Sequence, residues 1–102
     1  QKYISVTVDD IAYFYSEERV VFLVTLAGNK YITDYTLDEL ETMTDGRYFY
    51  RANRAFILHA RSVVSFQNDF SSRLRITVQP GIGREIMVSR EKATQFKEWM
   101  GR

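Results

Sequence analysis

The chain has 102 residues, 45% of them hydrophobic, and a formal net charge of +1 at pH 7, which is typical of one globular domain with a single core. No apolar run approaches the roughly 20 residues of a membrane-spanning helix, so we expect no membrane contact from this domain. Cysteine is absent, which excludes disulfides and thiolate chemistry and agrees with a cytoplasmic protein. Because no signal peptide is apparent and the chain begins with Gln1, we expect a piece of a longer protein.

The charges are distributed unevenly along the chain. Residues 1–46 hold nine acidic and three basic residues, whereas residues 47–102 hold four acidic and eleven basic residues, mostly arginine. Such asymmetry favours an anionic partner for one face of the domain. The alternative is that the fold interleaves the two halves and cancels the asymmetry in space.

The first third of the chain alternates between apolar and polar residues in the manner of β-strands. We expect strands at residues 3–8, 11–15, 19–26 and 31–33. A polar loop at residues 16–18 separates the second strand from the third. Residues 27–30 supply a hairpin turn between the third and the fourth, because glycine and asparagine tolerate positive φ.

The stretch that follows has a helical pattern. Thr36 and Glu39 form a capping box, in which the hydroxyl accepts a bond from the Glu39 amide while the carboxylate reaches back. Leu37 and Leu40 follow at helical spacing. We therefore expect a short structural helix at residues 37–43, packed on a sheet through its leucines.

Two arginines then lie three residues apart in front of an apolar run. Arg51 and Arg54 precede Phe56-Ile57-Leu58, and the run ends at His59. The guanidinium group is a rigid fork of five donors that matches phosphate oxygens or a guanine edge bidentately. The segment therefore suggests a surface that holds an anionic partner, with the apolar run as its anchor. The alternative is that both arginines are solvated and only the apolar run matters, as core.

The rest of the chain returns to strands and closes with a helix. We expect strands at residues 63–66, 73–78 and 85–88, with a hairpin loop at residues 80–83. Ser89 can cap a last helix that runs to Met100, and Gly101 suits its end. Seven or eight short strands and two short helices, joined by tight connections, favour an antiparallel, mainly β architecture.

The usual constellations of an enzyme are missing. His59 is the only histidine, and no cluster of His, Asp and Glu has the spacing of metal ligands. No Gly-x-Ser-x-Gly elbow is present, and Gly81-Ile82-Gly83 is too short for a dinucleotide-binding loop. We therefore expect no catalysis and no cofactor.

Several motifs, in order along nearly the whole chain, resemble the LytTR family of DNA-binding domains. They are Ile11-Ala12-Tyr13-Phe14, Leu37-Asp38-Glu39-Leu40, Tyr48-Phe49-x-Arg51-x-Asn53-Arg54-x-Phe56-Ile57-Leu58, and Val88-Ser89-Arg90 before a helix with Phe96. The resemblance implies an elongated stack of small antiparallel β-sheets that reads successive major grooves of DNA with its loops. It also implies the output domain of a bacterial two-component response regulator, of the LytR/AlgR type, behind an N-terminal receiver domain in the phosphorelay.

The resemblance also implies which residues meet DNA. Arg90 matches a basic residue that contacts base edges after the last strand, and Ser89 precedes it at a helix start. Arg54 matches a DNA-contacting position of the central segment. Its basic neighbour Arg51 and the intervening Asn53 belong to the same motif. The first recognition loop of the family corresponds to Ser16-Glu17-Glu18-Arg19. The partner that the resemblance implies is double-stranded DNA with paired direct-repeat sites. Two copies of the domain would bind these sites as a dimer.

Two positions depart from the family pattern. His59 stands where the family commonly has asparagine, and we expect a structural role for it, with a phosphate contact as the alternative. Glu17 and Glu18 place carboxylates on the first recognition loop, where they would repel phosphates but could accept a bond from cytosine, or could weaken non-specific binding. Four aromatic residues are expected in the core rather than stacked on bases: Tyr48, Phe49, Phe56 and Trp99.

Two other readings of the sequence stay open beside DNA binding. One is a protein-interaction β-module without nucleic-acid contact, which would use an exposed sheet edge or its tyrosine-rich surface. The other is an enzyme acting on a small ligand, which would need a deep pocket lined by polar groups.

Overall fold

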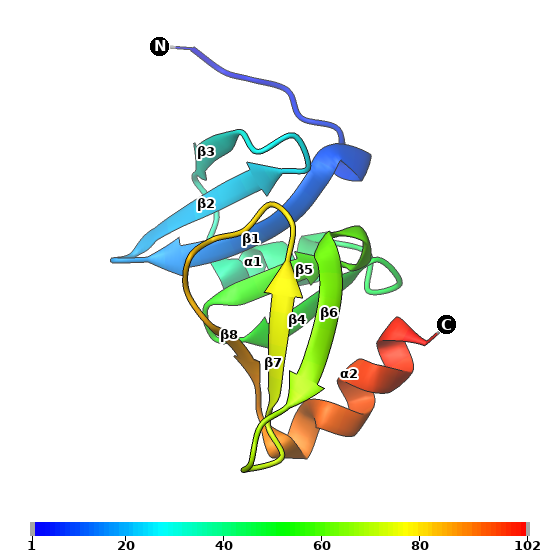
Figure 1. Ribbon diagram of the computed structural model, residues 1–102. Helices are drawn as coiled ribbons and strands as arrows, with labels where there is room; N and C mark the ends of the chain where they lie inside the picture. Colours follow the sequence, from blue (N-terminus) through cyan, green and yellow to red (C-terminus); the bar gives the residue numbers. More distant parts are fainter. Residues whose placement is uncertain (1, 102) are drawn as a thin grey trace.

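The computed structural model describes residues 2–101, which form two antiparallel β-sheets and two short α-helices (Figure 1). The domain is elongated, with principal extents of 47 × 29 × 24 Å. The expectation of a mainly β fold with helices near residues 37–43 and 90–100 is confirmed. None of the helices within residues 2–101 has the length and apolar character to cross a bilayer.

The first sheet has five strands in the order β3-β2-β1-β5-β4. Their bounds are β1 Ile11–Glu17, β2 Val20–Thr25, β3 Lys30–Thr33, β4 Phe49–Asn53 and β5 Phe56–His59. Strand β1 is the central one, and its first five residues are all buried. The hairpin between β2 and β3 turns at Gly28, whose φ of 95° is readily adopted by glycine. The expected turn at residues 27–30 is therefore confirmed.

Helix α1, Leu37–Met43, covers one face of this sheet. Its N-terminus has the expected capping box: the Glu39 amide donates to the Thr36 hydroxyl at 3.1 Å, and the Thr36 amide donates to the Glu39 carboxylate at 2.9 Å. Leu37 and Leu40 are buried against the residues on the face of the sheet that α1 covers. These are Ile11, Phe14, Phe49 and Ile57.

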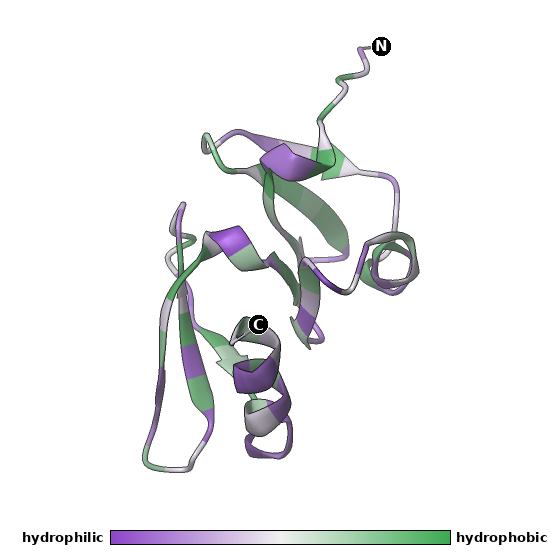
Figure 2. Cartoon of the chain, turned by 90° about the vertical axis from the view of Figure 1, so that its right-hand side faces the viewer, coloured by the Kyte–Doolittle hydropathy of each residue, from purple (hydrophilic) through white to green (hydrophobic). Residues whose placement is uncertain are grey.

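The second sheet packs against the opposite face of the first. It consists of β6 Val63–Asn68, β7 Leu74–Val78 and β8 Ile86–Val88, in that order. Alternate residues of β7 are buried, as the period-two pattern predicted. Helix α2, Ala93–Met100, closes this larger core with the fully buried Phe96. Figure 2 shows α1 end-on at one side of the molecule, across the first sheet from α2 and the second sheet.

The structure corrects two details of the sequence predictions, because one expected strand is absent and the last helix starts later than expected. Residues 3–8 are not a strand: Tyr3 is 82% exposed, and the segment ends in a 3-10 turn at Val8–Asp10. Helix α2 begins at Ala93, because residues 90–92 form another 3-10 turn. The Ser89 side chain makes no capping bond there, although its carbonyl accepts from the Lys92 amide at 3.0 Å.

Candidate nucleic-acid interface

The two arginines of the central segment lie on a hairpin that the sequence did not reveal. Arg51 belongs to β4, whereas Arg54 is exposed in the tight turn between β4 and β5. Ser16 of β1 donates its amide to the carbonyl oxygen of Ala55 at 3.0 Å, which holds the β4–β5 turn beside the β1–β2 turn. Arg19 of the β1–β2 turn and Arg54 therefore line one groove of about 560 Å³.

The β1–β2 turn has an unusual backbone. Glu18 and Arg19 both have positive φ, of 50° and 69°. Two consecutive residues of this kind form the hairpin turn that normally takes Asn-Gly, because larger side chains are strained there. Strain of this type is concentrated at functional sites. The turn places Arg19 close to Arg54, since both residues line the same groove.

Asn53 joins this end of the first sheet to the second sheet. Its Oδ1 accepts from the Ala55 amide at 2.8 Å, and its Nδ2 donates to the Met87 carbonyl oxygen of β8 at 2.8 Å. The chain reaches Ser89 and Arg90 two and three residues after Met87. Arg54 and Ser89 consequently line a second groove, of about 360 Å³. Both hydrogen-bonding ends of the Asn53 amide have internal partners.

Two arginines at this end, Arg19 and Arg54, differ from most others in their ion pairs. Of the arginines in residues 2–101, Arg19, Arg54 and Arg61 have no carboxylate within 4.0 Å, and Arg61 donates instead to the Asp9 carbonyl oxygen. Arg90 is 70% exposed and reaches Glu91 only at 4.0 Å. An exposed arginine that no carboxylate holds can donate to a phosphate or a base edge.

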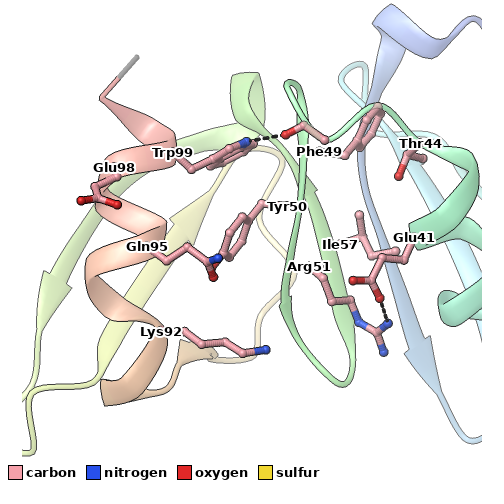
Figure 3. Close-up of a pocket in the computed structure, with 11 residues that line it drawn as sticks. Glu41, Thr44, Phe49, Tyr50, Arg51, Ile57, Lys92, Gln95, Glu98 and Trp99 are labelled. Atoms are coloured by element: carbon pink, nitrogen blue, oxygen red, sulfur yellow. Dashed lines mark hydrogen bonds and ion pairs between the residues drawn. The ribbon is translucent and has the colours of Figure 1, made fainter.

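Arg51 has a different environment from Arg54, and Figure 3 shows its ion pair with Glu41. Its side chain is 17% exposed, and Nη1 lies 3.0 Å from Asp38 and 2.8 Å from Glu41 of α1. Its Nε donates to the Asn53 carbonyl oxygen at 2.6 Å and its Nη2 to that of Arg54 at 3.0 Å. Arg51 therefore fastens the β4–β5 turn to α1, and its guanidinium is occupied inside the molecule.

The fold offsets part of the charge asymmetry between the two halves of the chain. Basic residues of the second half pair with acids of either half: Arg51 with Asp38 and Glu41, Arg73 with Asp69, Arg75 with Glu85, and Arg84 with Glu17. Only Arg51 and Arg84 among them pair with acids of the first half, so the alternative interpretation of the asymmetry holds in part. Arg19 and Arg54 remain at the turn end without a carboxylate of the described residues within 4.0 Å.

A family comparison decides what kind of domain this is. The model of the LytTr DNA-binding domain matches residues 1–101. The chain belongs to the LytTR family. A solved structure with the same fold is the LytTr DNA-binding domain of a Bacillus cereus protein described as a methyl-accepting/DNA response regulator, with a TM-score of 0.80 and 20% identity over 97% of this chain and 88% of that chain. The comparison with curated proteins gave no match.

His59 of this LytTR domain is a core residue. It is 3% exposed, its Nδ1 accepts from the Arg61 amide at 3.0 Å, and its ring meets Phe49 edge-on at 4.9 Å. Burial lowers the pKa of His59, and Arg61 lowers it further, against an opposing effect of Asp9. The expected structural role fits this environment, and the burial leaves no route to a phosphate.

The aromatic residues of the LytTR domain are mostly interior. Phe49 and Phe56 are buried as expected, and Trp99 is half-buried with its Nε1 donating to the Gly46 carbonyl oxygen at 2.9 Å. Tyr48 is 49% exposed and lies parallel to the His59 ring, so the prediction of a core position is wrong for it.

A groove of about 580 Å³ separates α1 from α2 in the LytTR domain (Figure 3). Tyr50 and Trp99 line it on the side of α2, and Glu41 and Arg51 on the side of α1. Arg51 is held there by its ion pairs, and Tyr50 by a hydrogen bond to Gln95 at 2.8 Å. Within residues 2–101, no group of three or more His, Asp and Glu side chains could hold a metal ion.

Proposed function

We propose that this LytTR domain binds double-stranded DNA sequence-specifically and regulates transcription. The observation that carries the proposal is the position of Arg54, exposed at the apex of the β4–β5 turn without an ion pair and flanked by Arg19 and Ser89 of two other segments. Arginines on separate turns can contact a duplex at several points along one side. An arginine pairs bidentately with the O6 and N7 atoms of guanine in the major groove.

The predicted site residues divide into two roles in this proposal. Arg54 and Arg90 read base edges, with Arg19 and the Ser89 hydroxyl as contacts to the backbone phosphates. Arg51 and Asn53 position the turn through their internal bonds. Glu17 and Glu18 are exposed beside Arg19 and belong to the same end of the domain.

The regulator around the domain is also part of the proposal. Residues 1–102 form a single output domain of a LytR/AlgR-type response regulator in a phosphorelay, and an N-terminal receiver domain controls it. Because its target is the chromosome, it acts in the bacterial cytoplasm. Two copies bind as a dimer on paired direct repeats, with no catalytic step.

Selection of binding sites from random duplexes tests this function. We expect one short motif, recovered in direct repeats, and binding to it that weakens steeply with salt. Arg54→Ala and Arg90→Ala should each weaken specific binding by about 1–3 kcal/mol without changing the urea midpoint of unfolding. No enriched motif, or mutants that bind the motif as well as the wild type, would exclude the proposal.

Arg61→Ala is the matched control for these variants. It removes one arginine that also lacks an ion pair, but Arg61 follows the end of β5 that is opposite to the β4–β5 turn. Its affinity for the selected duplex should stay within about twofold of the wild type, because its charge is far from the proposed contact points.

A further inference from the structure

Arg84 is a cation at the turn end that the sequence motifs did not single out. It lies in the loop between β7 and β8, and its Nη1 is 3.6 Å from the Glu17 carboxylate at the end of β1. The pair joins the two sheets although its residues are 67 positions apart in the chain, so no local pattern could reveal it. It lies immediately beside the strained turn that presents Arg19.

Two aromatic rings fix the place of the Arg84 guanidinium. Its central carbon is 5.0 Å from the centre of the Phe56 ring and 5.9 Å from that of Tyr15. Both rings are buried, and Phe56 lies two residues after Arg54 in the chain. A guanidinium that stacks on aromatic faces keeps its orientation while its edge remains available to donate. Arg84 is thus preorganised next to the proposed DNA contacts.

The ion pair between Arg84 and Glu17 is weak enough for another anion to replace Glu17. The two side chains are 39% and 52% exposed, and 3.6 Å is longer than the 2.7–2.9 Å typical of charge-assisted hydrogen bonds. Exposed pairs of this kind contribute little to folding stability. A phosphate oxygen, which is also an anionic acceptor, can replace the carboxylate without any change in the fold.

We propose that Arg84 is a further phosphate-contacting residue of this domain, and that Glu17 is its counter-ion in the free protein. The inference rests on the proposed DNA binding. When the domain docks, a backbone phosphate takes the place of the Glu17 carboxylate on Arg84. Glu17 thus lowers affinity for any anion that does not fully reach Arg84, which gives a physical role to a carboxylate on a DNA-facing loop.

Affinity and salt dependence of five variants on the selected duplex test the inference. Arg84→Gln keeps much of the side-chain length but removes the charge, and it should weaken binding about fivefold to tenfold at 0.1 M salt and reduce the salt slope by about 1. Glu17→Gln should tighten binding roughly two- to fivefold, because the competing ion pair is gone. The gain should vanish in the Glu17→Gln/Arg84→Gln double variant.

Glu18→Gln is the matched control, because it removes the neighbouring exposed carboxylate, which has no cation within 4.0 Å among the described residues. It should give less gain than Glu17→Gln. Equal gains from both, or a Glu17→Gln gain that persists without Arg84, would mean that the carboxylates merely repel DNA, and would overturn the inference. An unchanged affinity and salt slope in Arg84→Gln would overturn it as well.

The proposed function and this inference can fail separately. If Arg54→Ala weakens binding and Arg84→Gln does not, only the inference is wrong. If the wild-type domain enriches no duplex, the proposed function itself fails. Urea unfolding of every variant accompanies the titrations, and Arg84→Lys, which restores the charge, should recover part of the lost salt slope.

Discussion

At the scale of single residues, identical side chains at this site have different tasks because of their partners. Arg51 and Arg54 are three positions apart, and the sequence indicates that both belong to one functional segment. It could not separate them, since the carboxylates that occupy Arg51 come from α1, 10 and 13 positions away in the chain. The division between a fastening arginine and an exposed arginine therefore depends on tertiary structure.

Stability measurements should distinguish these two arginines. We expect Arg51→Ala to lower the free energy of unfolding by about 1.5–3 kcal/mol, because hydrogen bonds from a charged group to the turn and to α1 are lost. Arg54→Ala should stay within about 0.5 kcal/mol of the wild type, as exposed substitutions do. Urea unfolding at pH 7.5 measures both, and similar losses in the two variants would contradict the assignment.

His59 gives the domain a predictable response to pH. Because burial lowers its pKa, the unfolded chain takes up a proton at a higher pH than the native domain does. The free energy of unfolding should therefore be constant above the ordinary His pKa of 6.5 and should fall as the pH drops below it. Urea unfolding between pH 8 and 5 measures this, in a range where ordinary carboxylates, with pKa values near 4, stay ionised.

The His59→Asn variant is the control for this pH response. Its amide oxygen can still accept from the Arg61 amide, but it has no group that titrates in this range. Loss of the ring contact with Phe49 should lower stability at every pH, whereas the decline below 6.5 should disappear. A decline of the same size in the variant would assign the pH response to another group.

At the scale of elements, local sequence patterns predicted most strands and both helices. They failed where hydrogen bonding between distant segments determines whether a strand or a hairpin forms. Residues 3–8 alternate as a strand should, but no described strand pairs with them through a hydrogen-bonded ladder. The sequence did not reveal the β4–β5 hairpin, because its turn lacks the residues that usually mark one. Its turn contains Arg54 and Ala55 rather than glycine, and the Asn53 side chain closes it through the Ala55 amide.

The sequence predicted the capping box of α1 because its hydrogen bonds join residues close together in the chain. Its contribution to the free energy of unfolding can be measured. We expect Thr36→Ala to lower the free energy of unfolding by about 0.5–2 kcal/mol, since the hydroxyl that accepts from the Glu39 amide is lost. Thr42→Ala in the same helix should change it by less than about 0.5 kcal/mol, because that exposed hydroxyl only donates to the Glu39 carbonyl oxygen. Equal losses measured in urea would contradict a special role for the cap.

At the scale of the whole molecule, the proposed interface exists only because two sheets are held in register at one end. Arg54 belongs to the first sheet, whereas Ser89 and Arg90 follow the second, and the side chain of Asn53 connects them through the Met87 carbonyl oxygen. The family motif in the sequence indicates that Asn53 matters for DNA. In the proposed interface Asn53 acts through position rather than contact, because both ends of its amide have internal partners.

Asn53→Ala should therefore weaken DNA binding without removing a charge. Two hydrogen bonds are lost, and we expect the free energy of unfolding to fall by about 1–3 kcal/mol. Affinity for the selected duplex should fall as well, because Arg54 and Arg90 are no longer held at a fixed separation. Titration at 20 °C, where the variant is still folded by circular dichroism, measures this loss. A variant that is destabilised but binds with wild-type affinity would show that each sheet contacts DNA independently of the other.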